Sequence, residues 1–326
     1  MSESNPSAMD TQSAVDLLDR VREQLKRVLI GQETVVDQVL TALLAGGHVL
    51  IEGVPGLGKT LLVRALAQTF GGRFARIQFT PDLMPTDITG HTLYNMKESR
   101  FEVRRGPVFT NLLLADEINR APAKTQAALL EVMQEQQVTI ESKPFRVEDP
   151  FMVLATQNPI EQEGTYPLPE AELDRFMFKV FIDYPGEQEE VQLVQGVTAS
   201  AGQNQYLEQV QQLLQPAQIQ QLRERTRSVR IDEAVLRYLV RLVRATRDWR
   251  GVNRGAGPRG GIWLAHAARA YALMAGRDYV IPDDIKTVAR PVLRHRILLS
   301  ADMEIEGVRP DQVLQEILDE TAAPRQ

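Results

Sequence analysis

The chain has 326 residues, yet it contains no cysteine and only four histidines. Without cysteine it forms no disulfide, no thiolate nucleophile and no cysteine-ligated metal site, which is typical of a reducing compartment. The histidines, at positions 48, 91, 266 and 295, lack the spacing of metal ligands. Thiol chemistry is therefore excluded, a histidine metal centre is disfavoured, and His48, in an apolar segment, is expected in the core.

Long hydrophobic runs are also missing. The longest mostly apolar stretch, 39–51, is interrupted by two glycines and is too short to span a bilayer. The first 20 residues carry acids instead of an apolar segment, so no signal peptide is predicted. We therefore expect a cytoplasmic protein that does not insert into membranes.

An excess of positive charge is absent as well. The net charge is −6, and residues 1–185 hold 25 acidic against 18 basic side chains. A general nucleic-acid binder is usually basic overall, so nucleic acid is disfavoured as a partner. What remains, 43% hydrophobic and 25% charged residues, is typical of a folded globular protein of about two domains.

Hydrophobic patterns divide the chain in two. Residues 1–12 are polar and expected to be disordered, whereas apolar stripes predict helices over 14–28 and 33–45. Near-continuous apolar runs predict strands of a mostly parallel sheet, covered on both faces. The strand candidates are 48–52, 74–79, 111–115, 151–155 and 176–182. We expect an α/β domain over 13–185 and an all-helical domain over 186–326.

One motif dominates the α/β half. It is the phosphate-loop pattern G-x-x-x-x-G-K-[ST], flanked by a predicted strand and a predicted helix. Its glycines let backbone N–H groups surround phosphate oxygens, and the helix N-terminus adds positive charge. We predict that Lys59 contacts the β and γ phosphates and that Thr60 binds Mg²⁺. The predicted nucleotide-binding residues are Gly53, Val54, Pro55, Gly56, Leu57, Gly58, Lys59, Thr60 and Leu61.

Polar side chains end two of the predicted strands. Asp116 and Glu117 follow the run at 111–115, at the sheet edge where ligands lie in open α/β folds. Asp116 is expected to bind Mg²⁺, and Glu117 to activate water as a general base. Asn158 follows the next strand, where its amide can orient that water without adding charge. The residues together favour an ATPase over a nucleotide kinase, because only hydrolysis needs a base for water.

At these motifs the chain resembles the AAA+ ATPases, and within them the MoxR family. The resemblance runs from Ile30 to Arg296. It is carried by the segments 78–87, 116–121, 155–159, 173–176 and 276–280, besides the phosphate loop. It implies a fold in which a phosphate-loop AAA+ domain with a mostly parallel sheet is joined to a smaller helical lid domain.

The resemblance also implies roles for single residues. Asn158 corresponds to the sensor-1 amide, and Arg175 to the arginine finger that reaches the nucleotide of a neighbouring subunit. Arg259 corresponds to the sensor-2 arginine of the lid, which would face the nucleotide of its own subunit. Ile30 and Gln32 would border the adenine. The chain departs from the family pattern near Arg259, because Gly257 stands where the family often has a serine, and Gly260 and Gly261 weaken the turn that follows.

Two inserts follow from the same resemblance. Residues 88–110 would form a β-hairpin that interrupts a helix, and the alternation over 99–104 agrees with a hairpin. Residues 137–147 would form a second hairpin. In related ring ATPases such hairpins face the pore or the substrate, although they can equally be decoration.

The resemblance thus implies Mg²⁺-dependent ATP hydrolysis by a homo-oligomeric ring, most simply a hexamer. Hydrolysis would drive chaperone-like remodelling of a protein partner, which in this family often carries a von Willebrand factor A domain. Three alternatives stay open at this point: a nucleotide-dependent switch with little turnover, a DNA-acting motor, and the motor subunit of a metal chelatase.

Overall fold

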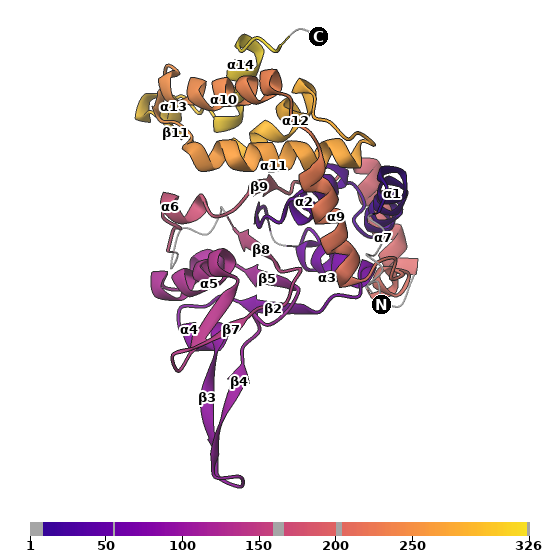
Figure 1. The fold of residues 1–326 in the computed structure, drawn as a ribbon, viewed down its shortest axis with the longest axis vertical. Coiled ribbons are helices and arrows are strands. Elements are labelled where there is room, and N and C mark those ends of the chain that lie inside the picture. Colours follow the sequence, from indigo (N-terminus) through magenta and orange to yellow (C-terminus); the bar gives the residue numbers. More distant parts are fainter. Residues whose placement is uncertain (1–8, 55, 159–165, 200–203, 325–326) are drawn as a thin grey trace, which may run out of the picture.

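The computed structural model describes residues 9–54, 56–158, 166–199 and 204–324. A five-stranded sheet is formed by strands between residues 49 and 181, and every neighbouring pair of strands runs parallel (Figure 1). The strand order is β2-β5-β8-β1-β9. The strands are β1 (Val49–Glu52), β2 (Phe74–Gln78), β5 (Leu112–Asp116), β8 (Met152–Gln157) and β9 (Phe178–Phe181). The predicted parallel α/β fold is confirmed.

Each face of the sheet packs against its own layer of helices. Successive strand side chains point to opposite faces, so Leu113 and Val153 belong to one core and Leu112 and Leu154 to the other. The first core is closed by α4 (Pro85–Thr89) and α5 (Ala123–Glu135). The second is closed by α1 (Thr11–Val28), α2 (Glu33–Ala45) and α3 (Lys59–Thr69). The sheet is thus buried on both sides, as its apolar strands require.

The first helix begins earlier than the sequence pattern indicates. Asp10 accepts a hydrogen bond from the backbone N–H of Ser13 at 2.8 Å, and this cap starts α1 at Thr11. The helix therefore includes the last two positions of the segment 1–12 that we expected to be disordered. Residues 1–8 of that segment lie outside the described part of the chain.

Helices dominate the C-terminal half. They are α6 (Glu170–Leu173), α7 (Glu187–Ala199), α8 (Asn204–Glu208), α9 (Pro216–Ser228), α10 (Glu233–Asp248), α11 (Pro258–Met274), α12 (Pro282–Leu293), α13 (Ala301–Ile305) and α14 (Pro310–Glu320). The region is not entirely helical, because the short strands β10 (Val252–Arg254) and β11 (Leu298–Leu299) pair antiparallel. Among the described helices, none combines the length and hydrophobicity needed to cross a membrane.

The helical region and the sheet share one core. Leu264 of α11 and Leu43 of α2 belong to the same buried cluster, and α11 packs directly along α2 (Figure 1). Helix α11 starts at Pro258 and continues through Gly260 and Gly261. The glycines that weaken the predicted helix start are therefore tolerated, because tertiary packing supplies the stability that helix propensity does not.

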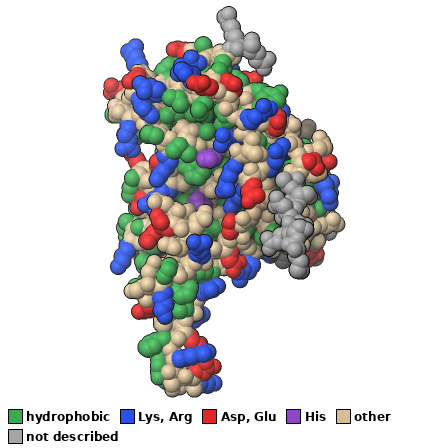
Figure 2. Space-filling view, in the orientation of Figure 1, with side chains coloured by type: hydrophobic (Ala, Val, Ile, Leu, Met, Phe, Trp, Pro, Cys, Tyr) green, Lys and Arg blue, Asp and Glu red, His purple; other side chains and the backbone are tan. Residues whose placement is uncertain are grey.

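Two hairpins project from the sheet domain, as predicted. The longer one, β3 (Gly90–Asn95) with β4 (Arg100–Arg105), extends far from the body (Figure 1). It follows α4 but does not interrupt a helix, because the chain goes from β4 through turns into β5. The shorter one is β6 (Gln137–Ile140) with β7 (Lys143–Arg146). Figure 2 shows hydrophobic side chains along the long hairpin, among which Met96 and Phe101 are 86% and 74% exposed.

His48 is a core residue, as its apolar neighbours predict. Its Nδ1 accepts a hydrogen bond from the backbone N–H of Val153 at 3.0 Å, so the proton sits on Nε2, 3.1 Å from the Met133 carbonyl oxygen. The imidazole, one residue before β1, thereby connects the start of that strand with β8 and the last turn of α5. Burial lowers the pKa of His48 to about 4.

A loss of stability in mild acid follows from this burial. The pKa of His48 is lower in the folded protein than the value of 6.5 in the unfolded chain. Between pH 6.5 and 4 the imidazole is therefore protonated mainly in the unfolded chain, and the free energy of unfolding falls as the pH is lowered through that range. From pH 7.5 to pH 5 we expect His48 to remove about 2 kcal/mol of unfolding free energy. Urea unfolding at pH 7.5 and at pH 5 measures this change in unfolding free energy.

The matched control is His48→Gln, whose amide can keep both hydrogen bonds but does not titrate. The pH-dependent difference should shrink by about 2 kcal/mol in this variant. His295, which is also buried with a pKa well below 6.5, contributes equally in both proteins and cancels. An undiminished difference in the variant would show that His48 is not responsible.

Candidate nucleotide-binding site

The phosphate-loop residues connect β1 to α3, which is the strand–loop–helix context that the motif requires. Gly56 and Gly58 have φ values of +89° and +78°, which side chains rarely adopt, so glycine is required for this turn. Lys59 is the first residue of α3, and its Nζ donates to the Gly53 carbonyl oxygen at 2.6 Å. Pro55 lies outside the described residues. The loop backbone is thus shaped around the N-terminus of a helix, where anions bind.

Lys59 lies between the loop and a group of carboxylates. Burial lowers the pKa of its ammonium group, and the charges of Asp116, Glu117 and Glu52 oppose that shift. The half-buried cation therefore has acids on one side and the phosphate loop on the other.

Asp116 ends β5 with both carboxylate oxygens engaged. Oδ1 accepts a hydrogen bond from Thr156 Oγ1 at 2.6 Å, and Oδ2 accepts one from Arg76 Nη2 at 2.6 Å. Arg76 lies on β2 and Thr156 on β8, the two strands on either side of β5. The parallel register therefore places a cation and a hydroxyl on this aspartate from opposite sides.

Glu117 has an unusual backbone. Its φ and ψ of 56° and 51° are left-handed, a conformation that costs a non-glycine residue about 1–3 kcal/mol and is concentrated at functional sites. The carboxylate accepts hydrogen bonds from Gln78 Nε2 at 2.8 Å and pairs with Arg120 at 3.0 Å. Its backbone N–H donates to Thr156 Oγ1 at 2.9 Å. The turn is therefore held so that the side chain faces the same space as Asp116.

These residues surround one pocket of about 460 Å³, within the size range of small-molecule sites. Of the predicted site residues, it collects Ile30, Gln32, the loop and helix positions 56–61, Asp116, Glu117 and Asn158. Gly53 and Val54 are described but do not line it; Gly53 acts through its contact with Lys59. Gln32 donates to the Asp183 carbonyl oxygen at 2.7 Å, which connects the predicted adenine segment to the end of the sheet domain.

Sequence reasoning missed several lining residues. They are Val28 and Leu29 at the end of α1, Arg76 and Gln78 on β2, Thr156 on β8, and Pro185, Leu193 and Tyr206 beyond the sheet. Arg76 and Gln78 carried no usable signal, because Gln78 lies opposite Asp116 only through the order of the strands in the sheet. Pro185, Leu193 and Tyr206 carried none either, because only the tertiary structure brings them to the pocket.

Arg175 and Arg259 lie elsewhere. Among the described residues, both line a separate hollow of about 230 Å³, together with His48, Met133 and Trp263. Arg259 Nη1 is 3.5 Å from Asp174 Oδ2, next to Arg175 in the chain. The prediction that Arg259 faces its own subunit's nucleotide does not match this arrangement. The reason is that α11 packs along α2 and not over the phosphate loop, so its first turn lies beside the Arg175 turn.

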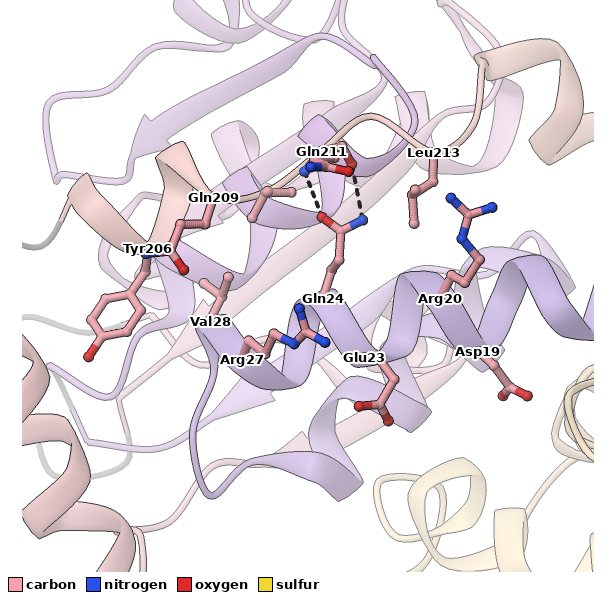
Figure 3. A pocket seen from close by; sticks show the side chains of 11 residues that line it. Asp19, Arg20, Glu23, Gln24, Arg27, Val28, Tyr206, Gln209, Gln211 and Leu213 are labelled. Carbon is pink, nitrogen blue, oxygen red and sulfur yellow. Dashed lines mark hydrogen bonds between the residues drawn. The ribbon is translucent and has the colours of Figure 1, made fainter.

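A third hollow adjoins the nucleotide pocket, between α1 and the segment after α8 (Figure 3). Gln24 of α1 accepts a hydrogen bond from the backbone N–H of Gln211 at 2.6 Å and donates to its carbonyl oxygen at 3.3 Å. Val28 and Tyr206 line both this hollow and the nucleotide pocket. The end of α1 is therefore a shared wall, and the Gln24 pair holds the segment after α8 against it.

Comparisons with known proteins identify the family and the fold. A family model described as "ATPase family associated with various cellular activities (AAA)" matches residues 48–178, and one described as "AAA lid domain" matches residues 244–317. Chaperone MoxR1 of Mycobacterium tuberculosis is 45% identical over 322 residues, covering 95% of this chain and 83% of MoxR1. YeaC of Bacillus subtilis is 46% identical over 310 residues, covering 95% and 96%.

The similarity extends to a solved structure. A crystal structure of a protein from Cytophaga hutchinsonii matches with a TM-score of 0.89 and 42% identity, over 97% of both chains. The alignments include the sheet domain, the inserts and the lid. The chain therefore belongs to the MoxR family of AAA+ ATPases.

Proposed function

We propose that this protein is a Mg²⁺-dependent ATPase that works as a homo-oligomeric ring, most simply a hexamer. The observation that carries the proposal is the convergence of Lys59, Asp116, Glu117 and Asn158 on one pocket, beside glycines shaped for phosphate. The family supports the ATPase class, and the residues support hydrolysis over binding alone.

The chemistry of the pocket fits both ATP and Mg²⁺. The turn at Gly56 and Gly58 directs backbone towards the N-terminus of α3, and Lys59 supplies a cation for the β and γ phosphates. Thr60 and Asp116 offer the hard oxygen ligands that Mg²⁺ prefers. When bound, Mg²⁺ neutralises charge on the phosphate oxygens.

Glu117 is the general base of the proposed reaction. Its carboxylate accepts a proton from water, while the Asn158 amide orients that water in the same pocket. In the structure Gln78 and Arg120 hold this carboxylate, and Arg76 holds Asp116. We therefore expect these partners to turn aside when nucleotide and metal bind, which makes the described arrangement a resting state.

Arg175 completes the site from the neighbouring subunit. Arg175 and Arg259 line a hollow that is separate from their own nucleotide pocket, which supports a role of both at the contact with a second copy of the chain. A guanidinium stabilises the charge that develops on a transferring phosphoryl group. We propose that Arg175 acts as the arginine finger and that Arg259 also reaches the adjacent subunit's nucleotide, so that hydrolysis requires assembly.

The work of the ring is the remodelling of a protein partner in the cytoplasm. MoxR1 of M. tuberculosis is named a chaperone. The long hairpin with its exposed Met96 and Phe101 supplies an apolar surface for such contacts. A partner with a von Willebrand factor A domain is our first candidate.

The proposal is tested by measuring whether ATP turnover per subunit depends on protein concentration. Phosphate release and molar mass are measured on the same samples across a dilution series, with and without ATP. We expect turnover per subunit to rise with the assembled fraction, because each site needs two subunits. If turnover per subunit is the same for monomer and ring, the shared site is contradicted. If the protein binds ATP without turning it over, the alternative of a nucleotide-dependent switch is favoured.

A further inference from the structure

The turn after α12 buries an arginine beneath the Arg175 turn. Arg296 is only 7% exposed, although arginine is almost never buried without partners. It belongs to the helical lid, whereas Arg175 lies between α6 and β9 of the sheet domain. A buried cation thus lies at the contact between the two parts of the molecule.

The Arg296 guanidinium is bonded to the residues on both sides of Arg175. Its Nε donates to Asp174 Oδ1 at 2.7 Å, and its Nη2 donates to the Asp174 carbonyl oxygen at 3.0 Å. Nη2 also donates to the Phe176 carbonyl oxygen at 2.6 Å, and Nη1 to that of Met177 at 3.2 Å. The planar, rigid fork of arginine fixes several acceptors at once, which lysine cannot do.

Helix α11 leaves room for this side chain. A Cβ at Gly260 would lie 3.1 Å from Arg296 Cδ, whereas a Cβ at Gly261 would have ordinary contacts of 3.7 Å or more. Gly260 follows Arg259, which pairs with the second carboxylate oxygen of Asp174, Oδ2. The lid therefore contacts the Arg175 turn through two arginines and a closely packed glycine.

The partners of Arg296 are needed to keep its charge buried. Burial lowers the pKa of Arg296 to about 10, and Asp174 opposes that shift, so the group stays cationic at neutral pH. A buried cation that loses its acceptors is strongly unfavourable. The guanidinium and the 174–177 backbone are therefore expected to move together when the lid moves.

We propose that Arg296 is a positioning residue that sets the direction of the arginine finger, Arg175, according to the position of the lid. The inference rests on the proposed trans action of Arg175. It extends that function by making one subunit's lid a control on the hydrolysis of its neighbour's ATP. Arg296 does not line its own subunit's nucleotide pocket, and in this proposal it acts through the turn.

Mixing variants separates this role from a merely structural one. A subunit with Arg296→Met keeps an intact nucleotide pocket, but its arginine finger, Arg175, is misplaced. Turnover should therefore fall about 100-fold with little change in KM for ATP. Added to Lys59→Ala, which has a dead site and an intact finger, the Arg296 variant should recover activity, up to about a quarter of wild type in a random 1:1 ring. Added to Arg175→Ala it should recover none, because neither subunit supplies a positioned finger.

A second buried arginine provides the control. Arg223 is also 7% exposed and is bonded to the Leu43 carbonyl oxygen and Asp149, away from the Arg175 turn. Arg223→Met should lower the melting temperature yet keep turnover per folded subunit within a few-fold. If Arg296→Met does not fold, Arg296→Lys is measured in the same mixtures, with a smaller loss of about tenfold expected.

The outcomes are distinct. The proposal is supported if the Arg296 variant recovers activity when mixed with Lys59→Ala but not when mixed with Arg175→Ala. It is overturned if the unmixed Arg296 variant has full turnover, or if it recovers activity with Arg175→Ala. It is also overturned if it recovers with neither variant although the mixture of Lys59→Ala and Arg175→Ala does recover. If that reference mixture itself fails, the trans finger is wrong and the role of Arg296 falls with it.

Discussion

Glu117→Gln should abolish ATP turnover while ATP binding and assembly persist. Glutamine matches the glutamate in size, so it can keep the contact with Gln78, but it cannot take a proton from water. General bases contribute about 100- to 10,000-fold to rate, so a loss in that range is expected. Phosphate release measures turnover, and equilibrium binding of a fluorescent ATP analogue measures affinity.

The control for this prediction is Glu131→Gln on the exposed face of α5, which makes the same chemical change outside the pocket. It should retain wild-type turnover. Light scattering with ATP should detect the same assembled mass for both variants. Turnover of Glu117→Gln within a few-fold of wild type would remove Glu117 from the role of base.

Arg175→Ala and Lys59→Ala should each be inactive alone, and mixing them should restore activity. Lys59 acts on the phosphates of its own subunit, whereas Arg175 is proposed to act on those of the neighbour. Removing an arginine finger costs about 1,000-fold or more in turnover. In a random 1:1 ring about a quarter of interfaces pair an intact pocket with an intact finger, so recovery near that fraction is expected.

Mixing two variants that both lack a working pocket provides the control. Lys59→Ala with Glu117→Gln should recover nothing, because every subunit then has a dead site. Full turnover by Arg175→Ala alone would show that Arg175 is not a finger. Inactive single variants with no recovery in the mixture, at concentrations where light scattering detects mixed rings, would contradict sites shared between subunits.

The sheet domain was predictable from local patterns. The apolar runs that end in Asp116 and Asn158 predicted buried parallel strands, and the structure confirms them as β5 and β8. The phosphate loop was predictable because backbone turns of contiguous residues make a phosphate cradle. The pair of hairpins came from the family resemblance, and alternation along the strands agreed with the longer one.

The partners of the acids were not predictable from any motif. Arg76 and Gln78 occupy Asp116 and Glu117 because β2 happens to lie next to β5 in the sheet, with Gln78 opposite Asp116. Sequence patterns predict strands but do not give their order. The resting contacts at the proposed catalytic carboxylates are therefore a product of topology.

The sequence by itself determined which chemistry this chain carries: a phosphate loop, two acids and an amide at strand ends, and two separated arginines. Only the tertiary structure decided where the arginines lie. Arg259 joins Arg175, away from their own pocket, because α11 buries its apolar face on α2. Arg296 reaches the same turn across 120 residues. Such contacts depend on how whole helices pack, and no local pattern encodes that packing.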